Sequence, residues 1–193
     1  MIKFLFGIVI GICLVLLGGY LYVTRSLSMS AEAKPLPMEE SIAQQAISSS
    51  VGKHAQDQSP LPADETNLLA GADIYQHNGC AGCHGRLDQL DSGMGKRFYP
   101  GAPHLLPPNK GVTDDPVGAT HWIVKNGIRF SAMPSFEQKL TDTEMWQVSL
   151  LLRNANKLPF PVQEALRKEA RKGHNPSSRP APRTSIRLTR AST

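Results

Sequence analysis

The stretch His77-Asn-Gly-Cys-Ala-Gly-Cys-His-Gly85 decides the fold, because it places two thiols three residues apart with an imidazole directly after the second. A structural zinc site normally needs four ligands in two pairs, and the only other cysteine, Cys13, lies in an apolar run near the amino terminus. A dithiol redox centre of the thioredoxin kind needs neighbouring strands, and the sequence has no convincing strand signal. The spacing instead favours covalent haem attachment, with Cys80 and Cys83 bonded to the two vinyl groups and His84 directed at the iron.

A haem would also supply a core that the segment 64–158 lacks. Three helices are expected there: 64–78, capped by Asp64 or Thr66; 116–128, which begins at Pro116; and 141–152, which begins with the capping box Thr141–Glu144. Residues 93–111, between the first two helices, are rich in glycine and proline, which favours a long loop over a strand. Such a domain of about 90 residues buries little apolar surface unaided. The predicted fold class is all-α with long loops around one haem.

The second axial ligand decides the chemistry of a bound iron, because an open position binds small molecules and a filled one passes electrons. Met133 is the leading candidate, since it lies in a proline-containing loop between helices, where a thioether can be directed at the iron. Met145 falls on the third helix and suits packing, whereas Met94 lies in a glycine loop ten residues after His84. The remaining candidates, which would give a bis-histidine iron of lower potential, are His104 and His121.

Residues 1–25 form a predicted transmembrane anchor. Phe4–Val23 contains twenty residues without a charge, and a helix of that length is about 30 Å long, the thickness of the hydrocarbon core of a bilayer. A cleaved signal peptide is the competing interpretation, because Ala31-Glu-Ala33 resembles a small-residue cleavage site. Lys3 precedes the apolar run and Arg25 follows it, which indicates that the amino end is cytoplasmic and the remainder lies outside.

Charge and composition separate two further segments from the central domain. Residues 26–63 are rich in Ser, Ala, Gln and Pro without an apolar period, which predicts a flexible linker. Residues 159–193 hold eight of the 21 Lys and Arg residues and two of the 16 acidic ones. We expect a basic, largely disordered tail with one short helix at Val162–Arg171, and a candidate contact with anionic lipid or an acidic protein. The central domain has no basic patch, which argues against nucleic acid as a partner.

Several stretches of the central domain together resemble a known family. They are Gly71-Ala-Asp-Ile-Tyr75, CAGCH at 80–84, HWIVKNGIRFSAMPSF at 121–136 and LTDTEMWQVSLLLR at 140–153. They are similar to the single-haem bacterial domains of class I c-type cytochromes, and the resemblance covers about Glu65 to Asn156. It implies the cytochrome c fold for 64–158.

The resemblance also implies roles for individual residues. Cys80 and Cys83 would carry the thioether bonds to one haem c, with His84 and Met133 as axial ligands of the iron. A proline carbonyl, that of Pro103 or else of Pro100, would orient His84. The first helix would cross the last at Gly71 and Tyr75 against Trp146 and Leu150. The candidates for contacts with the haem are Trp122, Arg129, Arg97 and Tyr99.

These features predict an electron carrier and not an enzyme. The chain would be a membrane-anchored monohaem cytochrome that passes single electrons between respiratory-chain partners, and methionine ligation would suit the high-potential end of such a chain. Its haem domain would lie on the periplasmic side of the bacterial inner membrane, since haem is attached to these motifs outside the cytoplasm. One alternative is an electron entry or exit subunit of a larger oxidoreductase. A second is a haem sensor or peroxidase-like protein, in which Met133 would be absent from the iron or easily displaced.

Overall fold

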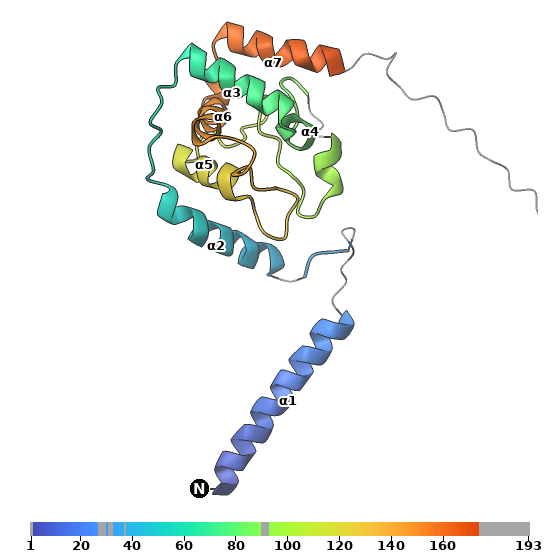
Figure 1. The fold of residues 1–193 in the computed structure, drawn as a ribbon. Helices are drawn as coiled ribbons and strands as arrows, with labels where there is room; N and C mark the ends of the chain where they lie inside the picture. The colour runs from blue at the N-terminus through green and yellow to red at the C-terminus, as the bar shows by residue number, and fades with distance from the viewer. Residues whose placement is uncertain (1, 27–29, 31–32, 37, 90–92, 174–193) are drawn as a thin grey trace, which may run out of the picture. The chain divides into compact units, whose positions relative to one another are not determined.

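The computed structural model describes residues 2–26, 30, 33–36, 38–89 and 93–173 (Figure 1). Helices make up the regular structure of these residues, and none of them forms a strand, as the sequence predicted. The chain divides into two compact units, residues 1–48 and 49–193.

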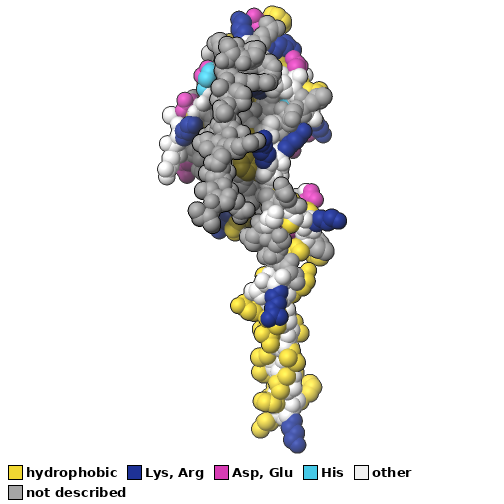
Figure 2. Space-filling view, turned by 90° about the vertical axis from the view of Figure 1, so that its right-hand side faces the viewer, with side chains coloured by type: hydrophobic (Ala, Val, Ile, Leu, Met, Phe, Trp, Pro, Cys, Tyr) yellow, Lys and Arg dark blue, Asp and Glu magenta, His cyan; other side chains and the backbone are white. Residues whose placement is uncertain are grey.

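The first unit begins with α1, Ile2–Ser26, which contains the predicted span Phe4–Val23. Its residues 2–25 form one helix that is long and apolar enough to cross a membrane. Apolar side chains surround the helix and remain exposed along its length (Figure 2). A helix that is apolar on all sides needs an apolar environment, which the protein itself does not provide here. The length and apolar character of this helix therefore support membrane anchoring.

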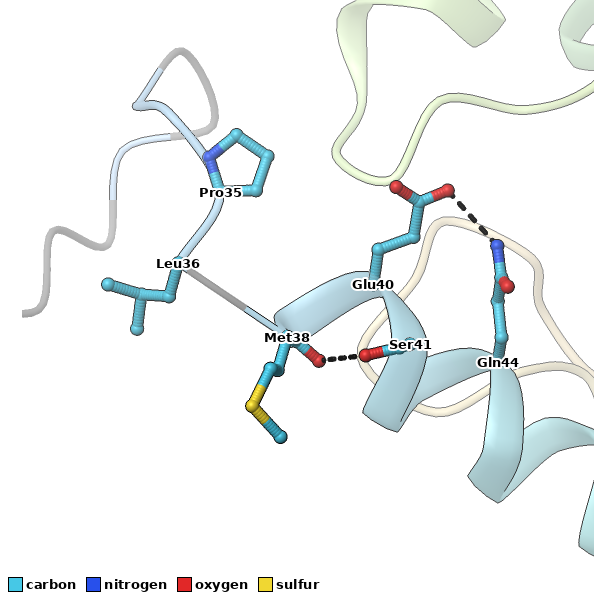
Figure 3. Close-up of a pocket in the computed structure, with 6 residues that line it drawn as sticks. All are labelled: Pro35, Leu36, Met38, Glu40, Ser41 and Gln44. Atoms are coloured by element: carbon cyan, nitrogen blue, oxygen red, sulfur yellow. Dashed lines mark hydrogen bonds between the residues drawn. The ribbon is translucent and has the colours of Figure 1, made fainter.

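A second helix, α2 at Glu39–Val51, lies within the segment that was predicted to be a linker. Glu39 and Glu40 in its first turn complement the helix dipole, and Ala and Gln residues favour the helix, although no apolar period signals it. A shallow depression at its start is lined by Pro35, Leu36, Met38, Glu40, Ser41 and Gln44 (Figure 3). The carboxylate of Glu40 accepts a hydrogen bond from Gln44 Nε2 at 3.0 Å, and Ser41 Oγ donates to the Met38 carbonyl at 2.9 Å. This depression presents no reactive group.

Among its described residues, the second unit contains the three predicted helices and five shorter or additional elements. Its α-helices are α3 (Glu65–His77), α4 (Cys80–His84), α5 (Val117–Asn126), α6 (Asp142–Arg153) and α7 (Phe160–Gly173). The 3-10 turns are η1 (Gly52–His54), η2 (Gly93–Arg97) and η3 (Ala155–Lys157). Asp64 caps α3 by accepting from the Asn67 amide, and both hydrogen bonds of the capping box at Thr141 and Glu144 are present.

Helices α3 and α6 cross at the centre of the unit (Figure 1). The crossing uses Gly71, as predicted, and the atoms nearest to a side chain there belong to Gln147 and Leu151, each one residue after the predicted Trp146 and Leu150. A side chain at position 71 would overlap the Gln147 carbonyl, so only glycine permits this approach. Tyr75, one turn further along α3, is fully buried.

Helix α7 differs from the short helix that was expected within a disordered tail. Val162 and Leu166 are fully buried, and α7 packs against α3. Gln76 Nε2 donates to the Leu166 carbonyl at 2.9 Å, and Arg167 forms an ion pair with Asp88 at 2.8 Å. The basic composition of the segment concealed two apolar positions four residues apart, which is one helical turn. The packed unit thus extends beyond the expected boundary at 158, and the predicted disordered stretch His174–Thr193 lies outside the described residues.

A segment that precedes α3 also packs on the unit. We call residues 51–58 the strap. Val51 is buried, and the His54 ring stacks on Trp122 of α5 with 6.1 Å between ring centroids. The backbone of the strap passes so close to Gly118 that a side chain there would overlap the carbonyl oxygens of His54 and Asp57. These residues were predicted to be linker. The two residues through which they contact α5, His54 and Gly118, lie 64 positions apart, and nothing in the sequence links them.

Candidate haem site

The short helix α4 carries both thiols and the imidazole of the deciding stretch. Gly79, with φ of +94°, lets the chain turn sharply between α3 and α4, a conformation that favours glycine. Cys80 and Cys83 are three residues apart on α4 and are both free thiols. Burial raises the pKa of the Cys80 thiol to about 11, so this thiol is protonated at neutral pH.

The His84 ring is held by the long loop that follows η2. Its Nδ1 lies 2.7 Å from the Pro103 carbonyl oxygen, which confirms the predicted contact with a loop proline. Because a carbonyl only accepts, Nδ1 carries the proton and the lone pair lies on Nε2. Burial lowers the pKa of His84, which further favours the neutral imidazole. A neutral imidazole with its outer nitrogen bonded to a carbonyl is the form that ligates iron.

The loop that carries Met133 is fixed to the end of α5. Gly127, with φ of +68°, packs against the backbone of residues 133–135 so closely that a side chain would overlap it. The Ile128 amide donates to the Met133 carbonyl at 3.1 Å, and Ser131 Oγ accepts from the Met133 amide at 3.1 Å. Met133 is half-buried and borders the same apolar core as Cys80. The thioether and the first thiol thus belong to one part of the domain.

The structure gives the other predicted iron ligands different surroundings. Met145 is buried in the core between α6 and its neighbours, and Met94 is 56% exposed. His121 is stacked on Trp146 and bonded to Asp142, with Nε2 3.2 Å from the carboxylate. His104 is bonded through Nδ1 to the Leu106 carbonyl at 2.9 Å. Each of these side chains has a local explanation, and Met133 remains the best placed of the sulfur ligands.

The structure places the predicted haem contacts in different settings. Pro103 lies at His84, whereas Trp122 is half-buried beneath the strap. The exposed members of the set are Arg97, Tyr99 and Arg129. Phe130, next to Arg129, is 92% exposed and has φ of +60°, an unusual conformation for a bulky residue.

Two residues that the sequence did not connect with Gly85 hold this residue, which follows His84. The Tyr75 hydroxyl donates to the Gly85 carbonyl at 2.7 Å, and the His104 ring lies against Gly85. The sequence drew attention to Tyr75 only for the helix crossing and to His104 only as a ligand. No periodic pattern links positions 75, 85 and 104, so sequence reasoning could not find this arrangement.

Comparison with protein families agrees with this site. Residues 66–150 match the family model described as cytochrome c oxidase, cbb3-type, subunit III. The match includes Cys80, Cys83, His84 and Met133. Comparison with curated proteins and with solved structures gave no significant match. The chain therefore carries a c-type cytochrome domain at residues 66–150, which implies haem binding and supports a part in electron transfer, and its apolar N-terminal helix supports membrane anchoring.

The donor set suits a haem. Two free thiols, a neutral imidazole with its lone pair on Nε2 and a half-buried thioether are the groups that this cofactor requires. A haem bound here supplies an iron that gains or loses one electron. The residues that would hold it are Cys80, Cys83, His84 and Met133.

Proposed function

We propose that the chain is a monohaem cytochrome whose single haem c is held by thioether bonds to Cys80 and Cys83. Each thiol would add across one vinyl group, with the sulfur bonding one carbon and the hydrogen the other, so that no electrons are gained or lost. His84 and Met133 would occupy the two axial positions. The observation that carries this proposal is the 2.7 Å hydrogen bond from His84 Nδ1 to Pro103, next to two free thiols on the same short helix.

This ligand set favours a carrier over a ligand-binding protein. A thioether in the second axial position leaves no place for a substrate, and it raises the potential relative to a second histidine. The fixed loop around Met133 supports this role, because four backbone and side-chain hydrogen bonds hold its turn in place. The proposed reaction is the transfer of single electrons between respiratory-chain partners at the membrane.

We place the haem domain on the periplasmic side of the bacterial inner membrane, with α1 crossing the bilayer once. Lys3 before the span supports a cytoplasmic amino end. The chemistry supports the same orientation, since haem is attached to these motifs outside the cytoplasm. Fusing a reporter that is active only in the periplasm after residue 173 should give an active reporter. If that reporter were inactive, and a reporter that works only in the cytoplasm were active at the same position, this orientation would be wrong.

A second function is supported by the family match. The matching family is described as subunit III of a cbb3-type cytochrome c oxidase, so the chain could serve as the electron entry or exit module of a larger membrane oxidoreductase. Mild detergent extraction distinguishes the two functions. Copurification of the native chain with other haem-containing subunits would favour the subunit, and a chain that purifies alone and exchanges electrons with several partners would favour the free carrier.

Optical spectra of the full-length protein, matured with haem, test the ligand assignment. The oxidised protein should show the thioether-to-iron band, and Met133→Ala should abolish it. Met94→Ala is the matched control, because Met94 is exposed and should leave the band unchanged. A band that survives in Met133→Ala would overturn the assignment. Rapid binding of carbon monoxide to the reduced wild-type protein at neutral pH would instead favour a sensor or peroxidase-like protein.

The basic tail is a candidate contact with anionic lipid or an acidic protein. Residues 174–193 carry four arginines and no acidic residue. Deleting them should weaken binding of the detergent-solubilised protein to phosphatidylglycerol vesicles at low salt, while phosphatidylcholine vesicles serve as the control. If the wild type and the variant without residues 174–193 bound phosphatidylglycerol vesicles equally, lipid would not be the partner of the tail. Slower electron transfer in that variant would then point to an acidic protein.

A further inference from the structure

Gly85 follows the proposed iron ligand and is held from two sides. Its φ is +80°, a conformation that favours glycine. On one side its carbonyl accepts a 2.7 Å hydrogen bond from the hydroxyl of Tyr75, which is fully buried on α3. This bond crosses from the core helix to the end of α4. It fixes the peptide that leaves His84.

On the other side lies the imidazole of His104. A side chain at position 85 would overlap Cδ2 and Nε2 of this ring, so the ring packs directly on the glycine backbone. Nδ1 of His104 lies 2.9 Å from the Leu106 carbonyl and must donate to it. Nε2 is buried and has no hydrogen-bond partner within the part of the chain that the structure describes.

An unpartnered buried acceptor in a native protein needs a reason, because leaving it unpaired destabilises the fold. The neighbouring contacts between residues 84–85 and 103–106 hold the His104 ring in this position. His104 directly follows Pro103, whose carbonyl holds the His84 ring at 2.7 Å. The Leu105 amide donates to the His84 carbonyl at 3.1 Å. The flat ring of His104 therefore lies between two points at which the chain segments 84–85 and 103–106 are joined.

We propose that Tyr75, Gly85 and His104 form a clamp that fixes the His84 ring against the Pro103 carbonyl, with Tyr75 and His104 as positioning residues for the axial ligand. The clamp rests on the proposed role of His84. Tyr75 fixes the peptide after His84, and His104 fixes the peptide that follows Pro103. Together they set the length of the bond from Nδ1 to the carbonyl. That bond increases the electron density on the imidazole, which favours ferric iron and lowers the reduction potential.

Loosening the clamp should therefore have two measurable effects on the full-length holoprotein. The Nδ1 proton of His84, observed by NMR, should exchange with solvent about fivefold faster or more, the factor that corresponds to the loss of about 1 kcal/mol of hydrogen bonding. The reduction potential should rise. Tyr75→Phe removes one hydroxyl and keeps the ring, so it should show both effects without loss of the fold.

His104→Phe separates positioning from simple packing. A phenyl ring keeps the flat contact with Gly85 and removes the unpartnered nitrogen, so a merely structural role predicts unchanged or higher stability and an unchanged potential. The clamp predicts a raised potential and faster exchange, because the bond to Leu106 is lost. His104→Asn, which can still donate to the Leu106 carbonyl, should restore part of both properties. The matched control is His77→Ala, a histidine exposed on α3, which should leave both unchanged.

The outcomes distinguish the clamp from the function on which it rests. If spectra show His84 on the iron but exchange and potential in Tyr75→Phe and His104→Phe equal those of the controls, the clamp is wrong and the cytochrome assignment stands. If spectra show that His84 does not ligate the iron, the proposed function is wrong. Faster exchange of the His84 proton in the variants would then still support the clamp as a device that positions this ring.

Discussion

Gly71 of α3 lies directly against the carbonyl oxygen of Gln147 on α6, and the Cβ of Leu151 lies 3.1 Å from the place where a side chain at 71 would begin. A second contact fixes the same crossing, because Gln147 Nε2 donates to Asn67 Oδ1 at 3.1 Å. The two helices thus meet backbone to backbone. Packing between α3 and α6 therefore depends on that short separation.

Gly71→Ala should destabilise the domain, because the added methyl group overlaps a backbone atom that cannot move alone. Overpacking of this kind costs about 1–3 kcal/mol, and we expect the free energy of unfolding in urea to fall by that amount. Gly52→Ala is the control, since nothing lies within 4 Å of a side chain at that position. Equal free energies of unfolding of Gly71→Ala and Gly52→Ala would show that α3 and α6 can move apart to accommodate the methyl group without loss of stability.

Leu166→Ala should reveal α7 as part of the folded domain. Leu166 is fully buried, and truncating a buried leucine to alanine costs about 2–5 kcal/mol. Lys168→Ala, on the exposed side of the same helix, should change stability little. Urea unfolding of both full-length variants measures the difference. A Leu166→Ala protein as stable as wild type would mean that α7 does not contribute to the core.

Gly118→Val should release the strap from α5, since the new side chain would occupy the place of the His54 and Asp57 carbonyls. Lys53 within the strap should then be cut by trypsin several-fold faster than in wild type, because proteases cut segments that open locally. Trp122 fluorescence should change as His54 leaves its ring. His54→Ala provides the comparison, because it removes the stacking and leaves the backbone contact. Unchanged cleavage in Gly118→Val would show that the strap binds by other contacts.

Acid should destabilise the domain partly through His121. The ring is buried against Trp146, with 3.8 Å between ring centroids, and burial lowers the pKa of His121 although the Asp142 carboxylate opposes this. Lys125 and Asp57 are the other charges that act on the ring. The unfolded chain therefore binds the proton more readily than the folded protein. The stabilising contribution is complete above the ordinary histidine pKa of about 6.5 and declines as the pH falls below it.

The measurement is the free energy of unfolding as a function of pH for wild type, His121→Gln and His77→Gln. His121→Gln should show a weaker loss of stability as the pH falls below the ordinary histidine pKa of about 6.5, because the proton uptake that distinguishes the unfolded chain is removed. His77→Gln, at an exposed position, should follow wild type. If both variants showed the same pH dependence as wild type, protonation of His121 would not contribute to acid unfolding.

The three central helices were predictable because local signals agree with tertiary packing. Asp64, Pro116 and the Thr141–Glu144 capping box mark helix starts that the structure retains. The contact from Pro103 to His84 was predictable only through resemblance to a family, since nothing in the spacing of these residues requires it. The nearest neighbours of Gly71 on α6 lie one residue after the predicted ones, because helical spacing alone does not fix the rotation of one helix against another.

The strap, α7 and the clamp were not predictable, for different reasons. The strap is held by backbone contacts with a glycine, which leave no pattern of apolar side chains. The side chains of α7 that the structure describes include two fully buried positions, Val162 and Leu166, and many of the helix's residues are charged, so its composition resembles a solvent-exposed tail. The clamp joins residues 75, 85 and 104, and each of them has an ordinary local explanation. Only a three-dimensional arrangement shows that they meet.

The packing of α7 and the strap has a practical consequence for preparing a water-soluble fragment. Cutting at 64 and 158, where the composition changes, would uncover Gly118 on one face and the neighbours of Val162 and Leu166 on the other. Newly exposed apolar surface promotes aggregation and lowers yield during haem maturation. A secreted form that runs from residue 49 to residue 173 retains both packed segments and leaves out the apolar helix α1. It is the form best suited to crystallisation and to measurements free of detergent.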